Sequence, residues 1–279
     1  MKKLFSGLRI GQLELAHRLV TTIDPRARLS ADDYRRRATP GGLVIAARYA
    51  DGAASPADWK RIVDSVHDVG SLAVALISPE SKQQEPVVLD VDPVMDVYQR
   101  TARSARAAGF DGVELDAGAG ALAERFLQAH TNARDDEYGG DTERRMRFLL
   151  EAVYVLAEEF SHERAGVRLS PCAREGQVEL FADVMRALSE RELAYVHLAH
   201  ERTPVAPRVS GLSVSIAACA DRQVFRTDVS CALIASDFVD VDVATSAVER
   251  RWADAVGFFQ TDEDPEFVAR ILRQRDLTP

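Results

Sequence analysis

The sequence has few cysteines, and their spacing excludes two kinds of cysteine chemistry. Only Cys172, Cys219 and Cys231 occur in 279 residues, and no two of them form a CxxC pair or stand next to a histidine. A disulfide framework needs an even set of cysteines, and a structural zinc site needs closely spaced ligands. We therefore expect neither a disulfide framework nor a metal site, and we expect the cysteines to act as small apolar fillers.

The sequence also lacks long apolar runs and an excess of positive charge. No run approaches the ~18 apolar residues that mark a bilayer-spanning helix. The first residues, MKKLFSGLRIGQLEL, contain two lysines but no apolar core and no cleavage site of a signal peptide, so we expect a cytoplasmic location. The formal net charge is −9, which argues against nucleic acid and against a membrane surface as partners.

Short apolar runs alternate with helical patterns along the chain. The runs that read as strands are Arg18–Ile23, Gly41–Ala46, Leu72–Ile77, Gly112–Leu115, Gly166–Leu169, Tyr195–Ala199, Cys231–Ala235 and Ala255–Phe259. Strands that alternate with helices in this way predict an α/β fold, a single (β/α)8 TIM barrel over residues 1–279. A hairpin over Leu4–Leu15 would close the bottom of the barrel, and residues 204–229 fit either a helix or a strand.

Two phrases of the sequence resemble a known family. LFSGLRIGQLELAHRLV at residues 4–20 and TNARDDEYGGDTERRMRFLL at residues 131–150 are similar to phrases of the old yellow enzyme family of FMN-dependent ene-reductases. The resemblance covers nearly the whole chain and implies the same barrel. It also implies that Arg168 faces the flavin ring and that residues after the fourth strand bind a substrate carbonyl and donate a proton.

The positions of the family's substrate-binding residues are changed in this sequence. The family places a His, a second His or Asn, and a Tyr where this chain has Asp116, Ala119 and Ala121. The long excursion that follows the third strand in the family is shortened here to about residues 79–92. The resemblance therefore implies the fold more strongly than it implies the reaction.

The flavin contacts that the resemblance implies are changed as well. Ala75 stands in place of a Gln that binds the flavin ring, and Ser236-Asp237 and the cation-free run 257–260 stand where the family binds the phosphate. Loss of an Arg–phosphate pair removes roughly 1.5–3 kcal/mol of binding, and a carboxylate beside a dianion adds repulsion of about 1 kcal/mol. We therefore expect that the chain has lost FMN and uses no cofactor.

The candidate site residues follow from the rule that TIM barrels react at the C-terminal ends of their strands. The predicted catalytic residues are Asp116, Arg168 and His200. The predicted substrate-binding residues are Asp24, Arg48, Ser170, Asp237, Phe258 and Phe259.

Several of these candidates have structural alternatives. Asp116 could transfer protons or could cap the glycine-rich loop that follows it, and Arg168 could clamp a ligand or pair with a carboxylate. Phe258 and Phe259 could stack on a planar ligand, but filling the space of an absent flavin is favoured because an empty apolar cavity is costly. His197, inside a strand, is predicted to be a core residue.

Three functions fit these observations. The first is a flavin-independent enzyme, a cyclase or isomerase that uses acid–base chemistry on a small molecule. The alternative is a non-catalytic binding protein or partner subunit, and the second alternative is an atypical FMN-dependent ene-reductase. A homodimer or a paralogous partner is compatible with the first two. Charged residues at the predicted mouth of the barrel favour the first function, in which Asp116 moves the proton.

Overall fold

Eight parallel strands form a closed barrel in the computed structural model. The structure describes residues 2–24, 27–49, 55–78, 89–171, 177–199, 226–236, 240–259 and 264–275. Around the barrel the strand order is β10-β3-β4-β5-β6-β7-β8-β9, and every neighbouring pair is parallel. The strands are β3 (Leu19–Thr22), β4 (Leu43–Tyr49), β5 (Leu72–Ile77), β6 (Gly112–Ala117), β7 (Ala165–Leu169), β8 (Tyr195–Leu198), β9 (Ala232–Ala235) and β10 (Ala255–Phe259). The predicted (β/α)8 TIM barrel is therefore confirmed.

An N-terminal hairpin closes one end of this barrel. Its strands, β1 (Leu8–Ile10) and β2 (Leu13–Leu15), pair antiparallel. Ile10, Leu13 and Leu15 are buried in one apolar cluster with residues of the barrel strands, including Val20 and Ile234. Apolar side chains thus fill the barrel interior at the end that the hairpin covers. The opposite end, where the C-terminal ends of the strands lie, is the end at which a ligand can enter.

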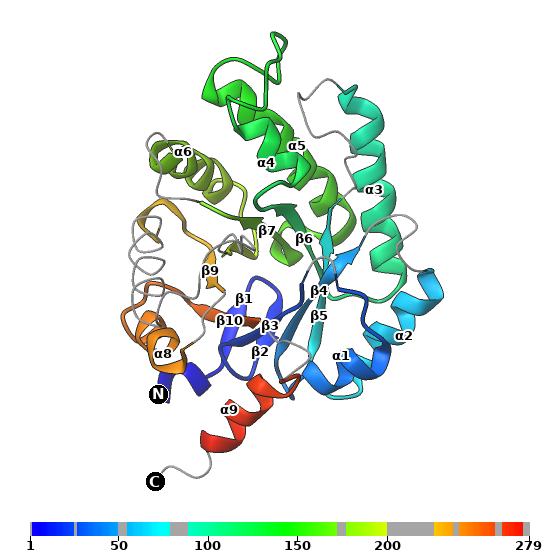
Figure 1. Cartoon of the computed structure of the whole chain (residues 1–279), viewed down its shortest axis with the longest axis vertical. Helices are drawn as coiled ribbons and strands as arrows, with labels where there is room; N and C mark the ends of the chain where they lie inside the picture. Colours follow the sequence, from blue (N-terminus) through cyan, green and yellow to red (C-terminus); the bar gives the residue numbers. More distant parts are fainter. Residues whose placement is uncertain are drawn as a thin grey trace.

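Helices surround the barrel. They are α1 (Ala31–Arg37), α2 (Pro56–His67), α3 (Val91–Ala107), α4 (Leu122–Leu127), α5 (Thr142–Phe160), α6 (Gln177–Ser189), α8 (Val241–Glu249) and α9 (Phe267–Arg275), with 3-10 turns at η1 (Lys2–Phe5), η2 (His162–Arg164) and η3 (Arg226–Asp228). In Figure 1 they follow one another around the strands in chain order, from α1 and α2 through α3, α5 and α6 to α8. No helix in the described ranges is long and apolar enough to cross a membrane.

Local sequence signals explain where these helices begin. Ser30 and Ser55 each accept a hydrogen bond from the backbone of the third helical residue, and Asp33 and Asp58 return the bond, so both helices start with a capping box. Pro56 occupies the first turn of α2, where its missing N–H costs nothing. The buried face of α2 consists of Trp59, Ile62, Val63 and Val66, which recur at helical spacing.

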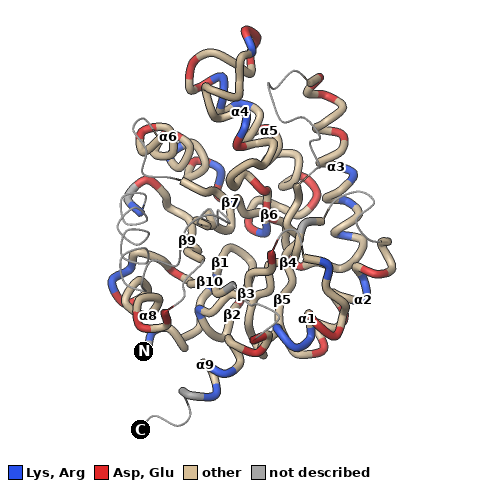
Figure 2. The backbone as a smooth tube through the Cα atoms, viewed as in Figure 1, with Lys and Arg blue, Asp and Glu red and all other residues tan. Residues whose placement is uncertain are grey.

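Charge of both signs lies on the outside of the barrel. Figure 2 shows acidic and basic positions interspersed along the outer helices. Exposed ion pairs such as Lys60–Asp64 on α2 and Arg35–Asp68 between α1 and the end of α2 contribute little to the free energy of unfolding, because solvent screens them. The fold is therefore held mainly by its apolar layers.

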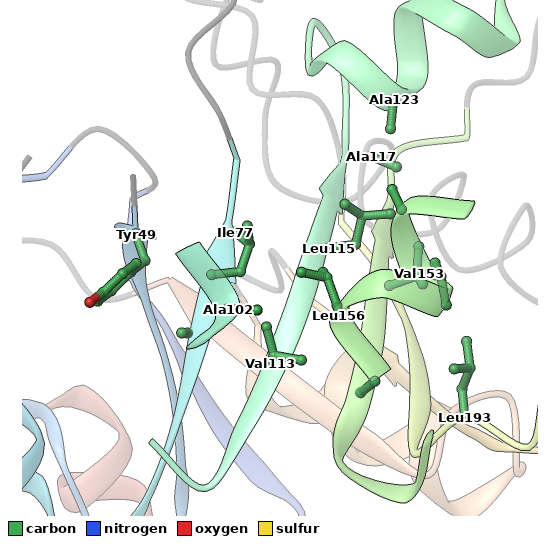
Figure 3. Packing of buried hydrophobic residues seen from close by; sticks show 14 of the residues in the cluster. Tyr49, Ile77, Ala102, Val113, Leu115, Ala117, Ala123, Val153, Leu156 and Leu193 are labelled. Atoms are coloured by element: carbon green, nitrogen blue, oxygen red, sulfur yellow. The ribbon is translucent and has the colours of Figure 1, made fainter. Parts of the chain in front are cut away.

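Strand β6 contributes side chains both to the outer apolar core and to the barrel interior. Val113 and Leu115 belong to the outer apolar layer, and Figure 3 shows them beside Leu156 and Val153 of α5. Because side chains alternate along a strand, Glu114 and Asp116 point to the other side, into the barrel. All six residues of β6 are buried, as in a strand covered on both faces.

Candidate functional site at the C-terminal end of the barrel

Polar residues occupy the inward positions at the upper ends of several strands. Val20, Ile234 and Ala255 lie in the apolar interior. Two residues further along the same three strands, the inward positions hold two hydroxyl side chains, Thr22 and Ser236, and Gly257. The same alternation brings Asp116 of β6 and Arg168 of β7 to the interior, where the two residues are register partners. The interior therefore changes from apolar to polar toward the end at which barrels bind ligands.

Asp116, Arg168 and Ser170 converge on one glycine. A Cβ atom at Gly118 would lie 3.2 Å from Asp116 Oδ1, 3.2 Å from Ser170 Oγ and 3.6 Å from Arg168 Nε. Asp116 is 6% exposed, and its Oδ1 accepts a hydrogen bond of 3.1 Å from the Gly118 amide. A carboxylate, a hydroxyl and a guanidinium thus share one small space. The predicted capping role of Asp116 is present, and the capped carboxylate lies in the mouth.

A second polar group lies deeper in the barrel. His197 of β8 is completely buried, with Nδ1 at 3.1 Å from both carboxylate oxygens of Glu114 and Nε2 at 2.8 Å from Ser236 Oγ. The carboxylate of Glu114 accepts the Nδ1–H, which fixes the orientation of the ring. The prediction that His197 is a core residue is confirmed. Its hydrogen bond to Ser236 connects this buried group to the C-terminal end of the barrel.

Tyr195 completes the buried group under the mouth. Its ring passes so close to Gly166 of β7 that any side chain at that glycine would collide with it. Burial, and then the Glu114 carboxylate nearby, hold the pKa of Tyr195 well above its usual range. The phenol therefore stays neutral, and it adds no charge to the Glu114–His197 pair.

Only part of the predicted site can be placed. Ser170 and Arg168 lie beside Asp116, as given above, and Asp24 follows β3 at the same end of the barrel and is half-buried. His200 and Asp237 fall outside the described residues. Arg48 and Phe259 lie in β4 and β10, but their side chains are outside the described part of the structure.

Phe258 does not lie in the mouth. It is fully buried in the cluster between β10 and the outer helices, and its ring centroid is 5.4 Å from that of Phe267 of α9. Ala75 likewise belongs to the outer layer, so it does not occupy an inward, flavin-facing position. Alternate residues of a strand face opposite sides, and both of these residues face the outer layer.

The loop between α4 and α5 is structural. Arg134 donates to Asp136 and to the carbonyl of Leu89, and Asp136 also accepts from the Tyr138 amide at 3.1 Å. Asp136, in the acidic run at residues 135–137, therefore supports the loop. No group of three potential metal ligands occurs among the residues that the structure describes.

Comparison with known proteins places this barrel in a family. A model of the NADH:flavin oxidoreductase / NADH oxidase family matches residues 79–278. The chain belongs to this family. It is 31% identical over 265 residues to the NADP-dependent oxidoreductase lnbE of Aspergillus flavus, over 74% of this chain and 70% of that protein. It is 29% identical to 12-oxophytodienoate reductase 1 of Oryza sativa subsp. japonica, over 91% of this chain and 82% of that protein.

Solved structures agree with this membership. Morphinone reductase, in a mutant form in complex with tetrahydroNAD, superposes with a TM-score of 0.73 at 25% identity and covers 92% of this chain and 86% of its own. The old yellow enzyme homologue from Zymomonas mobilis has a TM-score of 0.79 at 23% identity, covers 98% of this chain and 93% of its own, and supports the fold alone. The resemblance to old yellow enzyme is therefore confirmed.

The expectation that the chain uses no cofactor is wrong. It is overturned by the match to a flavin oxidoreductase family and by the likeness to morphinone reductase, which together point to FMN. The sequence argument weighed side chains, whereas backbone amides after the seventh and eighth strands of a barrel can hold a phosphate without an arginine. The mouth also fits a polar ligand, because the buried hydroxyl of Thr22 has no hydrogen-bond partner among the described residues.

Sequence reasoning missed Thr22 and Glu114. Thr22 stood in an apolar run, and nothing in the sequence showed that its hydroxyl would be left without a partner while that of Thr21 donates to the Arg37 carbonyl at 3.0 Å. Glu114 did carry a signal, because an acidic residue in the middle of a buried strand requires a partner. His197 supplies that partner from a strand distant in sequence.

Proposed function

We propose that this protein is an FMN-dependent oxidoreductase that reduces the carbon–carbon double bond of an α,β-unsaturated carbonyl compound. Its membership of a flavin oxidoreductase family supports the flavin, and the reductases among its relatives support the direction of the reaction. The observation that supports it most is the grouping of Asp116, Arg168 and Ser170 in the mouth of a barrel of this family.

The bound flavin would supply a hydride. Arg168 would hold the cofactor, because a guanidinium donates to carbonyl and ring-nitrogen acceptors in a fixed plane. Ser170, beside Arg168, adds a hydroxyl donor to the same space. Thr22 offers a further hydroxyl at the opposite wall of the mouth.

Asp116 would handle the proton. Reduction of a carbon–carbon double bond needs a proton as well as a hydride, and the chain has Asp116 where the family is expected to use an imidazole. A carboxyl group that is shielded from bulk water can transfer a proton once substrate excludes the remaining water. The guanidinium of Arg168 would stabilise negative charge that develops on the substrate oxygen.

Turnover of an enone tests this proposal. The purified protein, supplied with FMN and NADPH, is expected to oxidise NADPH anaerobically in step with loss of the double bond of a cyclic enone, at a rate that depends on FMN. An enone that remains intact with FMN bound would contradict the reaction. Loss of the enone without FMN and without oxidation of NADPH would instead be the redox-neutral reaction of a cyclase or isomerase, for which the oxidoreductases named above give no support.

A further inference from the structure

The hydroxyl of Thr22 is an unusual group at the mouth of this barrel. Thr22 is 3% exposed, and its Oγ1 has no hydrogen-bond partner among the residues that the structure describes. A buried hydroxyl without a partner destabilises the folded state, so such groups are rare and call for an explanation. A ligand that completes the hydrogen bond is one such explanation.

The position of Thr22 points to a ligand. Val20, two residues earlier on β3, is in the interior cluster, so Thr22 also faces inward at the upper end of the first barrel strand. Other buried polar atoms without a hydrogen-bond partner belong to Trp59 on α2, Ser71 before β5, His162 in η2 and Tyr195 at the first residue of β8. They are therefore away from the C-terminal strand ends, where a ligand binds.

Thr22 has a second hydroxyl as its neighbour. A Cβ atom at Gly257 of β10 would lie 3.0 Å from Thr22 Cγ2 and 2.5 Å from Ser236 Cβ, so the two side chains flank this glycine. Ser236 is held by His197, and His197 is held by Glu114. The ends of β3, β9 and β10, the first, seventh and eighth barrel strands, therefore form a polar corner. The corner is also rigid, because the buried hydrogen bonds from Glu114 through His197 fix the hydroxyl of Ser236.

We propose that Thr22 Oγ1 hydrogen-bonds a polar atom of the bound flavin. This inference rests on the proposed function for the identity of the ligand. Phosphate-bearing ligands of TIM barrels commonly place the phosphate in the loops after the seventh and eighth strands. Ser236 is the first residue after the seventh strand, so the corner that contains Thr22 adjoins one of the loops that would hold the phosphate.

The variant Thr22→Val tests the inference, because valine keeps the shape and removes the hydroxyl. In the flavin-free protein the variant is expected to raise Tm by about 2–4 °C, since an unpaired buried polar group is lost. The same variant is expected to weaken riboflavin binding about 5- to 50-fold, as measured by quenching of flavin fluorescence. A gain in stability with a loss in affinity is the pattern of a hydroxyl reserved for a ligand.

The neighbouring Thr21 provides a matched control. Its hydroxyl faces the helix layer and donates to the Arg37 carbonyl at 3.0 Å. Thr21→Val is therefore expected to lower Tm and to leave riboflavin affinity unchanged, which is the reverse of the result for Thr22→Val. The pair separates a ligand contact from a general effect of replacing threonine with valine in β3.

A comparison of riboflavin with lumiflavin, which lacks the polyol chain, identifies the atom that Thr22 contacts. Weakened binding of riboflavin alone assigns Thr22 to the polyol chain, and equal weakening of both assigns it to the ring. Flavin binding that Thr22→Val leaves unchanged would overturn this inference and leave the proposed function intact. Absence of flavin binding to the unaltered protein would overturn both.

Discussion

At the scale of the residue, Asp116 connects the structure to the chemistry. Its side chain is nearly buried, its Oδ1 is held by the Gly118 amide, and Arg168 and Ser170 lie beside the same glycine. A carboxyl group fixed in this way has one orientation, and its protonated form can deliver a proton to a substrate that binds beside it. Capping and proton transfer are therefore compatible in this residue, although the sequence presented them as alternatives.

Asp116→Asn is expected to lower kcat for enone reduction by ~10²–10⁴, because the amide keeps the shape but cannot transfer a proton. Tm should change little, since the asparagine oxygen can still accept from Gly118. Steady-state kinetics and a melting curve measure the two effects. Full activity in the variant would show that Asp116 only caps its loop.

Asp136→Asn is the contrasting variant, because Asp136 supports the loop after α4 through Arg134 and the Tyr138 amide. It is expected to cost about 1–2 kcal/mol of unfolding free energy, by loss of hydrogen bonds to a charged group. Its kcat should stay close to that of the unaltered protein. A change in kcat as large as that of Asp116→Asn would remove the distinction between the two carboxylates.

At the scale of the element, strands and helices differ in how well the sequence predicts them. Helix α5 (Thr142–Phe160) begins after Asp141, whose side chain accepts from the Arg144 amide, and capping boxes mark the starts of α1 and α2. The apolar runs locate the strands but not their two faces, because a strand of a barrel is buried on both sides. Phe258 was misplaced for this reason.

The capping box of α1 makes a prediction about acid. Hydrogen bonds from the Ser30 hydroxyl and the Ser30 amide hold the pKa of Asp33 at about 2, below its ordinary value of 3.8. Because the folded pKa is depressed, this stabilisation is present above pH ~4 and is lost as pH falls toward 2. Asp33→Asn is therefore expected to lower Tm at pH 7 and to flatten the fall of Tm between pH 4 and 2.

Asp32→Asn is the control for this prediction, because Asp32 is exposed in the same turn and takes no part in the capping box. The difference in Tm between the unaltered protein and Asp33→Asn should shrink between pH 4 and pH 2. A constant difference over that range would show that the carboxylate of Asp33 is not what stabilises the helix start.

At the scale of the whole molecule, the sequence predicts the barrel because its evidence is spread over the chain. Eight apolar runs and the helices between them agree, so an error at one end of a strand does not change the fold. The site depends instead on contacts between residues distant in sequence, such as Glu114 with His197. The cofactor was misjudged because changed side chains were visible in the sequence, while backbone donors were not.

Titration with FMN tests the central claim, that this barrel is a flavin enzyme, most directly. At about a hundredfold excess of FMN over its Kd, binding to the folded state alone is expected to add roughly 2.7 kcal/mol to the unfolding free energy and to raise Tm by several degrees. The flavin absorption band should shift and stay with the protein through gel filtration. An unchanged Tm, with flavin that elutes apart from the protein, would contradict the account.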